Sequence, residues 1–83
     1  MKQRGFHLVQ GRVQRVGFSK NSIWLNLPGR FAIRIKREDA VYFKKLDFKT
    51  LKGKQVIARG WLQNHNNELR LRVRHPAALQ IMR

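Results

Sequence analysis

The sequence has no cysteine and very few acidic residues. Without cysteine, the chain cannot form disulfide bonds, bind zinc through thiolates or use a thiol as a nucleophile. Its 83 residues include only four Asp and Glu against nineteen Lys and Arg, so the formal net charge is +15. A charge of this size favours an anionic partner.

Long apolar runs are also absent. No stretch approaches the roughly 18 apolar residues that are needed to cross a bilayer. Residues 1–15 lack the apolar run and the cleavage site of a secretory signal. We therefore expect a soluble, cytoplasmic protein with no membrane partner. The length predicts a single domain over residues 1–83, with a core too small for a deep substrate cavity.

Two segments alternate apolar and basic residues with a period of two. In residues 69–74, three aliphatic residues alternate with Arg70, Arg72 and Arg74. Residues 30–36 repeat the pattern, with three apolar residues between the basic ones. This alternation predicts half-buried strands that have a basic outer face.

A β-hairpin is predicted over residues 22–36. Residues 22–27 place Trp24 on the face opposite three aliphatic residues. The pair Pro28-Gly29 supplies the fixed φ and the positive φ that a tight turn needs before the strand of residues 30–36.

Two further strands are less regular. Residues 55–63 alternate, and the polar loop of residues 64–67 joins them to the strand of residues 69–74 in a second hairpin. Residues 6–16 predict a first strand, with Gly11 or Gly17 as the site of a sharp bend.

The alternation breaks between the two hairpins. We expect a short helix over residues 39–46 that is capped by Asp39, because three apolar residues of this segment fall on one side of a helix. A basic connection over residues 47–54 follows it. The apolar tail after Pro76 is expected to pack on the core.

Three strands, a short helix and two strands therefore follow one another along the chain. Five strands on so short a chain must curl to hide their edges, which predicts a mainly β fold, a small five-stranded barrel. This order resembles the oligonucleotide/oligosaccharide-binding (OB) fold, whose usual ligand face is formed by strands two and three. Residues 53–62 (GKQVIARGWL) and 71–76 (LRVRHP) are similar to the closing segment of OB domains in bacterial thermonuclease-like proteins.

Nuclease activity of that kind needs a cluster of carboxylates that holds a divalent metal. Three of the four acidic residues lie around the predicted helix, and the fourth opens the last strand, so no two strand-borne carboxylates converge. We expect no enzyme activity. The acidic residues are Glu38, Asp39, Asp47 and Glu68.

The other residue types that often carry chemistry are also dispersed. His7, His65 and His75 lack the short spacing of a metal-binding pair, and no Ser/His/acid order surrounds Ser19 or Ser22. We therefore expect no metal, no cofactor and no catalytic residue.

Cations and exposed aromatics occur together, and single-stranded nucleic acid requires both. Phosphates are bound by Lys and Arg, and unstacked bases by flat aromatic rings. Trp24 and Trp61 are the candidate stacking platforms, and Trp24 is favoured over Trp61 because it lies on the same hairpin as Arg30 and Arg34. Structural roles stay open beside stacking: Trp24 covers an open end of the barrel or packs under the helix, and Trp61 packs against the tail.

The basic residues expected at the ligand face come from four parts of the chain. Arg70, Arg72 and Arg74 form a row with a repeat of roughly 6.5–7 Å, which is comparable to the spacing of phosphates in an extended strand. Together with the two tryptophans, the candidate nucleic-acid-binding residues are Arg12, Lys20, Trp24, Arg30, Arg34, Lys36, Arg59, Trp61, Arg70, Arg72 and Arg74.

Three hypotheses for function follow. The first is a non-catalytic module that binds single-stranded or structured nucleic acid, DNA or RNA, with little sequence specificity. The second is a thermonuclease-like phosphodiesterase, or the substrate-gripping part of a larger nuclease. The third is a module that binds polyanions or acidic proteins in general. The expected protein partner is a larger nuclease or a nucleoprotein assembly.

Overall fold

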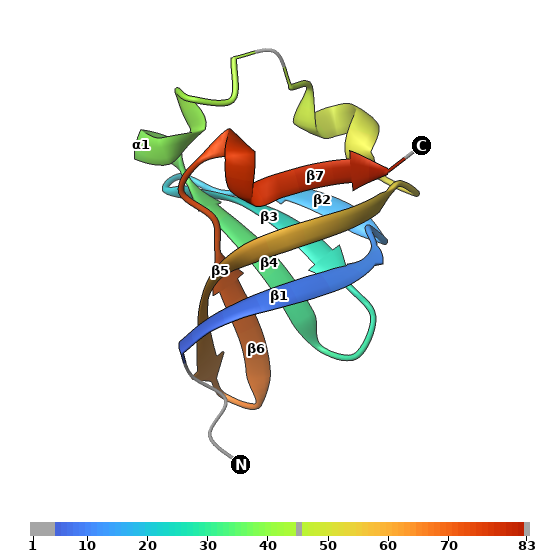
Figure 1. The fold of residues 1–83 in the computed structure, drawn as a ribbon, viewed down its shortest axis with the longest axis vertical. Helices are drawn as coiled ribbons and strands as arrows, with labels where there is room; N and C mark the ends of the chain where they lie inside the picture. The colour runs from blue at the N-terminus through green and yellow to red at the C-terminus, as the bar shows by residue number, and fades with distance from the viewer. Residues whose placement is uncertain (1–4, 45, 83) are drawn as a thin grey trace.

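A single sheet of seven strands dominates the computed structural model, which describes residues 5–44 and 46–82. The strands are β1 (Gly5–Arg12), β2 (Arg15–Phe18), β3 (Ser22–Leu27), β4 (Phe31–Lys36), β5 (Gln55–His65), β6 (Glu68–Arg72) and β7 (Leu79–Met82). Helical structure in the described ranges is short: the α-helix α1 (Arg37–Ala40) and the 3₁₀ helices η1 (Phe48–Leu51) and η2 (Pro76–Ala78). The prediction of a mainly β fold is confirmed (Figure 1).

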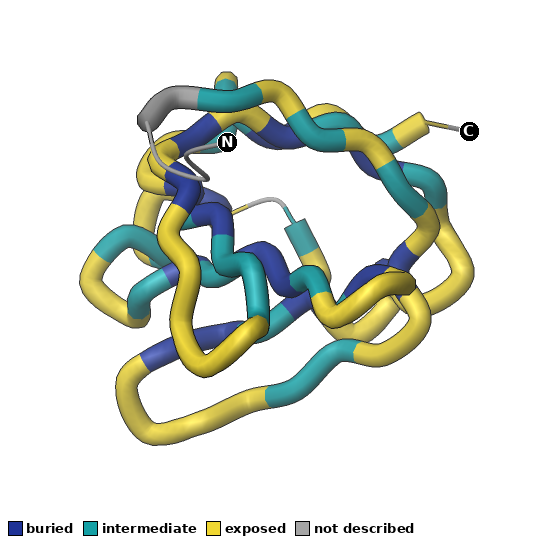
Figure 2. Tube along the Cα trace, turned by 90° about the horizontal axis from the view of Figure 1, so that it is seen from below, coloured by how far each residue is buried: buried dark blue, intermediate teal, exposed yellow. Residues whose placement is uncertain are grey.

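The strand order explains how the sheet curls. Neighbouring strands follow the order β1-β5-β6-β4-β3-β2, and β7 also pairs with β5. β4 and β6 are parallel, whereas the other described pairs are antiparallel. The two ends of this order, β1 and β2, are consecutive in the chain. The sheet therefore curls into a barrel-like shape, which Figure 2 shows along the long axis of Figure 1.

The chain changes partners between β1 and β2 within two residues. The amide of Val13 donates to the carbonyl of Lys54 at 2.9 Å, just before β5. The amide of Gln14 donates instead to the carbonyl of Asn26 on β3, at 2.8 Å. Because Val13 is also buried, this short link connects both edges of the sheet to the core.

The prediction of five strands is wrong for two reasons. The segment of residues 6–16 forms two strands, because its pairing partner changes at Val13 and Gln14 and not at Gly11 or Gly17. The apolar tail packs on the core as expected, but it also forms β7, paired with residues 55–58 of β5. Alternation within a segment does not reveal such a change of partner.

The predicted helix over residues 39–46 is wrong in extent. α1 has four residues and is preceded by Lys36, and Asp39 lies inside it and does not cap it. No helix continues through residues 41–44 or through residues 46 and 47. Phe43 is buried against Phe48, with 5.7 Å between the ring centroids. The apolar residue Phe43 of this segment is therefore buried in the core, as its pattern suggests, but without a helix over residues 39–46.

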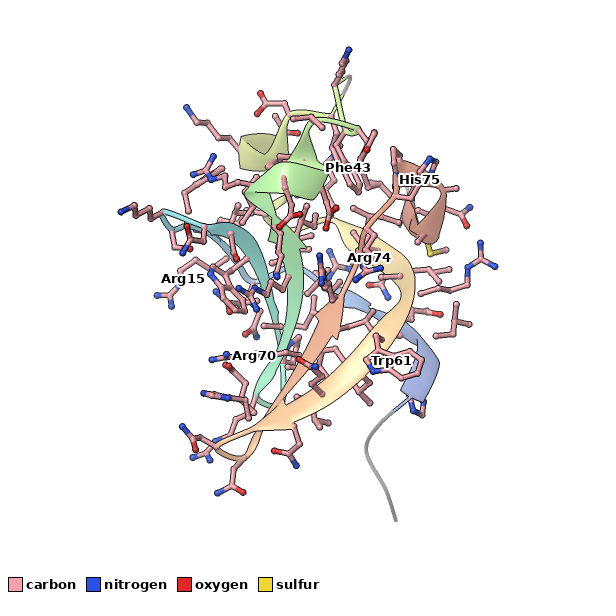
Figure 3. The ribbon with its side chains drawn as sticks, turned by 90° about the vertical axis from the view of Figure 1, so that its left-hand side faces the viewer. Arg15, Phe43, Trp61, Arg70, Arg74 and His75 are labelled. Atoms are coloured by element: carbon pink, nitrogen blue, oxygen red, sulfur yellow. The ribbon has the colours of Figure 1, made fainter. Side chains whose placement is uncertain are left out.

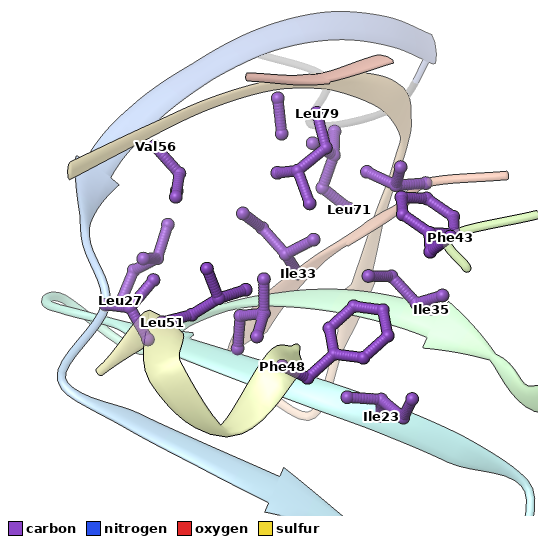
Figure 4. Packing of buried hydrophobic residues seen from close by; sticks show 14 of the residues in the cluster. Ile23, Leu27, Ile33, Ile35, Phe43, Phe48, Leu51, Val56, Leu71 and Leu79 are labelled. Carbon is purple, nitrogen blue, oxygen red and sulfur yellow. The ribbon is translucent and has the colours of Figure 1, made fainter. Parts of the chain in front are cut away.

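The inward faces of the strands form one apolar core (Figure 4). Leu25, Ile33 and Leu71, on three neighbouring strands, are fully buried, as their alternation predicts. The predicted turn between β3 and β4 is also confirmed, since Gly29 has a φ of 78°. No helix in the described ranges is long and apolar enough to span a membrane.

Candidate functional site

A row of four side chains crosses the outer face of the sheet. The register pairs Trp24 of β3 with Arg34 of β4, Arg34 with Arg72 of β6, and Arg72 with Trp61 of β5. Each is flanked along its strand by buried aliphatic residues or, for Trp61, by Gly60 and Leu62, so the row faces away from the core. We call Trp24, Arg34, Arg72 and Trp61 the cross-sheet row.

Three members of this row, Arg34, Arg72 and Trp61, line an open groove of about 960 Å³. Its lining contains six Lys and Arg residues and no Asp or Glu among the described residues. Figure 3 shows Trp61 beside β5, with Arg70 and Arg74 along β6 and the segment after it. The lining residues are Arg34, Lys36, Arg59, Gly60, Trp61, Gln63, Asn64, His65, Arg70, Arg72, Arg74, His75 and Ala78.

Two of the groove arginines are held by acidic residues. Arg70 Nε donates to Glu68 Oε1 at 2.8 Å on the same strand. Arg72 Nη2 donates to Asp39 Oδ2 at 3.2 Å, which connects β6 to α1. The side chain of Arg72 is 25% exposed and that of Asp39 is 13% exposed. These pairs fix the direction of two guanidinium groups while part of each stays accessible to solvent.

Trp24 lies half-buried among polar partners. The guanidinium carbons of Arg34 and Arg70 lie 5.3 Å and 4.9 Å from the centre of its ring. Its Nε1 donates to Ser19 Oγ at 3.2 Å. Arg34 Nε donates in turn to the buried hydroxyl of Ser22 at 2.8 Å. Trp24 is therefore enclosed by cations on the outer face of the sheet.

Trp61 is the more accessible tryptophan. It is 55% exposed and lines the groove opposite Arg72. The tail strand pairs with residues 55–58 and stops short of Trp61. Trp24 was expected to be the better stacking platform, but Trp61 is the more exposed of the two rings.

The structure brings together eight of the eleven candidate residues. Seven line the groove, and Trp24 contacts two of these seven. The remaining three lie outside the lining. Arg12 donates through Nη1 to the carbonyl of Gly53 at 2.9 Å, Lys20 lies between β2 and β3, and Arg30 lies in the turn between β3 and β4.

The lining also includes polar residues that the sequence pattern did not indicate. Gln63 faces Arg70 across β5 and β6, and Asn64, His65 and His75 lie nearby in the lining. β5 extends to His65, and only Asn66 and Asn67 form the turn, both with positive φ. Two asparagines in succession favour such a two-residue hairpin turn, so the sequence did contain a signal for the longer strand.

The described residues offer little for metal chemistry. They include no group of three or more His, Cys, Asp and Glu that could hold a metal ion. Two of the four acidic residues are paired with groove arginines, Asp39 and Glu68. What this face provides is positive charge, hydrogen-bond donors and one open aromatic ring.

Comparisons with other proteins add no relative to this description. No protein-family model matches the chain, and no curated protein is detectably similar to it in sequence. Function is therefore inferred from the geometry of the groove.

Proposed function

We propose that this chain is a non-catalytic, OB-type module that binds single-stranded nucleic acid in the groove. The arginines and lysines bind the phosphates, and Trp61 stacks on a base. The cross-sheet row is the observation that carries this proposal, because it places two cations between two aromatic rings on four neighbouring strands. Phosphates and unstacked bases are the two kinds of group that such a row fits.

The strand order supports the OB-type assignment. A bent first segment that contacts both β5 and β3, a parallel pair of β4 and β6, and a short helix after β4 are all consistent with a small Greek-key barrel. β3 and β4, which correspond to the usual ligand strands of that fold, carry Trp24 and Arg34.

Neighbouring strands supply different contacts. The outer face of β6 presents Arg70 and Arg72, two residues apart and so roughly 6.5–7 Å apart along the strand, which suits successive phosphates. The outer face of β5 presents Trp61 and Gln63 directly opposite these arginines. A single-stranded nucleic acid that lies along the groove would thus place its phosphate backbone over β6 and its bases over β5.

Low sequence specificity follows from the type of contact. Arg–phosphate contacts carry no base information, and every base has a face that can stack on an indole ring. The same chemistry accepts DNA or RNA. Four further expectations stay predictions. They are a single domain over residues 1–83, a cytoplasmic location, the absence of a cofactor, and membership of a larger nuclease or nucleoprotein assembly.

The test is a titration of intrinsic tryptophan fluorescence with a short oligothymidylate and with the matching oligouridylate. Polyphosphate and heparin serve as base-free anions. We expect saturable quenching by the oligonucleotides and none by the two controls. Equal responses to all four ligands would replace the proposal with general polyanion binding.

The enzyme hypothesis needs a separate assay. Labelled oligonucleotide is incubated with the protein in the presence of Mg²⁺ or Ca²⁺ and, in parallel, of a chelator. We expect intact oligonucleotide in every case. Cleavage that requires the metal would establish the thermonuclease-like activity instead.

A further inference from the structure

The surroundings of Trp24 are unusual for a base-stacking platform. Two guanidinium groups lie over its ring, and its indole N–H already donates to Ser19. A base that stacked on a face covered by a guanidinium group would first have to displace that group. Trp61, in contrast, is 55% exposed and lines the open groove.

Arg70 reaches Trp24 from two strands away. In the sheet register, Arg70 of β6 pairs with Ala32 of β4, and Ala32 pairs with Asn26 of β3. The small side chain of Ala32 leaves room for Arg70 to extend across β4 toward β3. Its guanidinium carbon thereby comes within 4.9 Å of the centre of the Trp24 ring.

The hydrogen bonds of the two arginines show which of their atoms are in use. Arg34 donates through Nε to Ser22, and Arg70 donates through Nε to Glu68. Within residues 5–44 and 46–82, the terminal Nη groups of both arginines donate to no protein acceptor. A guanidinium held at Nε and against an aromatic face presents its two Nη groups together, which is the arrangement that binds two phosphate oxygens at once.

We propose that Trp24 is a positioning residue, which orients Arg34 and Arg70 toward phosphates, and that Trp61 alone stacks on bases. This inference rests on the proposed function and assigns different roles to the two tryptophans within the same site. Trp24 acts through the arginines and does not touch a base. The module then binds one stacked base, with the phosphates on both sides of that base bound by the arginines.

Two single-tryptophan variants separate the two roles. Trp61→Phe leaves Trp24 as the only tryptophan, and Trp24→Phe leaves Trp61. Each is titrated with oligothymidylate and with an abasic oligomer of the same length. In Trp24→Phe we expect quenching by oligothymidylate but not by the abasic oligomer. In Trp61→Phe we expect the two oligomers to give equal responses.

Affinities test the positioning role directly. Trp24→Leu should weaken the binding of oligothymidylate and of the abasic oligomer alike, by roughly three- to ten-fold, because both lose ordered arginines. Trp24→Phe should restore part of this loss. In an Arg34→Gln/Arg70→Gln background, Trp24→Leu should have no further effect. Thermal unfolding of each variant checks that the fold is retained, and the Phe variant keeps the test valid if the Leu variant unfolds.

The outcomes distinguish this inference from the proposal on which it rests. Quenching of Trp61→Phe by oligothymidylate but not by the abasic oligomer would show that Trp24 stacks on bases, which overturns the positioning role and leaves the proposed function intact. A loss in Trp24→Leu that persists in the double-arginine background would also overturn it. If the wild-type protein binds neither oligomer, the proposed function itself fails.

Discussion

Gly60 of β5 and Arg72 of β6 pass so close that a Cβ atom on Gly60 would overlap the carbonyl oxygen of Arg72. Gly60 is buried, and it lies beside Trp61 in the lining of the groove. The absence of a side chain at this position therefore allows β5 and β6 to bring Trp61 and Arg72 face to face.

Gly60→Ala should destabilise the protein by about 1–3 kcal/mol, the usual cost of forcing an extra carbon into a packed site. The obstacle here is a backbone atom, which cannot rotate out of the way. Urea denaturation followed by circular dichroism measures the effect.

Gly17→Ala is the matched control. A Cβ atom there meets only Trp24 Cβ, at an ordinary distance of 3.8 Å. Its free energy of unfolding should stay within about 1 kcal/mol of the wild-type value, because no packed atom must move. An equal loss in the two variants would contradict the assigned close contact.

The two ion pairs of the groove should differ in their contribution to stability. Asp39→Asn removes the partner of the more buried arginine, Arg72, whose Nε has no hydrogen-bond partner within residues 5–44 and 46–82. Leaving that charge less compensated should cost about 1–2 kcal/mol. Glu68→Gln removes a more exposed pair and should cost less than about 1 kcal/mol. Urea denaturation of the two variants measures both losses of unfolding free energy. A larger loss in Glu68→Gln than in Asp39→Asn would show that the ion pair between β6 and α1 is not the more stabilising of the two.

Trp61→Ala should weaken the binding of oligothymidylate by about 1–3 kcal/mol, which is the contribution of one base stacked on an aromatic ring. Binding of an abasic oligomer should not change, because the phosphate contacts are kept. Fluorescence anisotropy of labelled oligomers measures both.

Phe18→Ala provides the control for Trp61. Phe18 is 47% exposed and lies on β2, outside the lining of the groove. Its removal should leave both affinities unchanged. A loss of the same size in the two variants would indicate general hydrophobic adhesion to the surface and not stacking in the groove.

The sequence predicted those elements that depend on local pattern. The alternation that includes Ile33 and Leu71 fixed which faces are buried, and Pro28-Gly29 marked a real turn. Both signals are carried by neighbouring residues, so no knowledge of pairing is needed.

The features that the sequence did not predict depend on contacts between distant segments. A helix capped by Asp39 was expected, yet the cap in this region is Asp47, whose side chain accepts a hydrogen bond from the amide of Lys49 at the start of η1. Either aspartate suits the pattern, and burial of Phe43 against Phe48 determines the outcome.

The candidate site shows the same limit. All six Lys and Arg residues that line the groove were predicted from their outward positions on strands. Their grouping requires the parallel pairing of β4 and β6, which places Arg34 beside Arg72 although they are far apart in the chain. The position of Arg70 over Trp24, and hence the different exposure of the two tryptophans, also depends on this pairing.

The salt dependence of oligothymidylate binding is the most direct test of phosphate binding in the groove. If the groove contacts four to six phosphates, the logarithm of the affinity plotted against that of the salt concentration should have a slope of roughly −3 to −4. Arg70→Gln should make this slope less steep by about 0.7, whereas Lys49→Gln, an exposed cation outside the groove, should leave it unchanged. A slope near zero, or an equal change in the two variants, would contradict binding of phosphates in the groove.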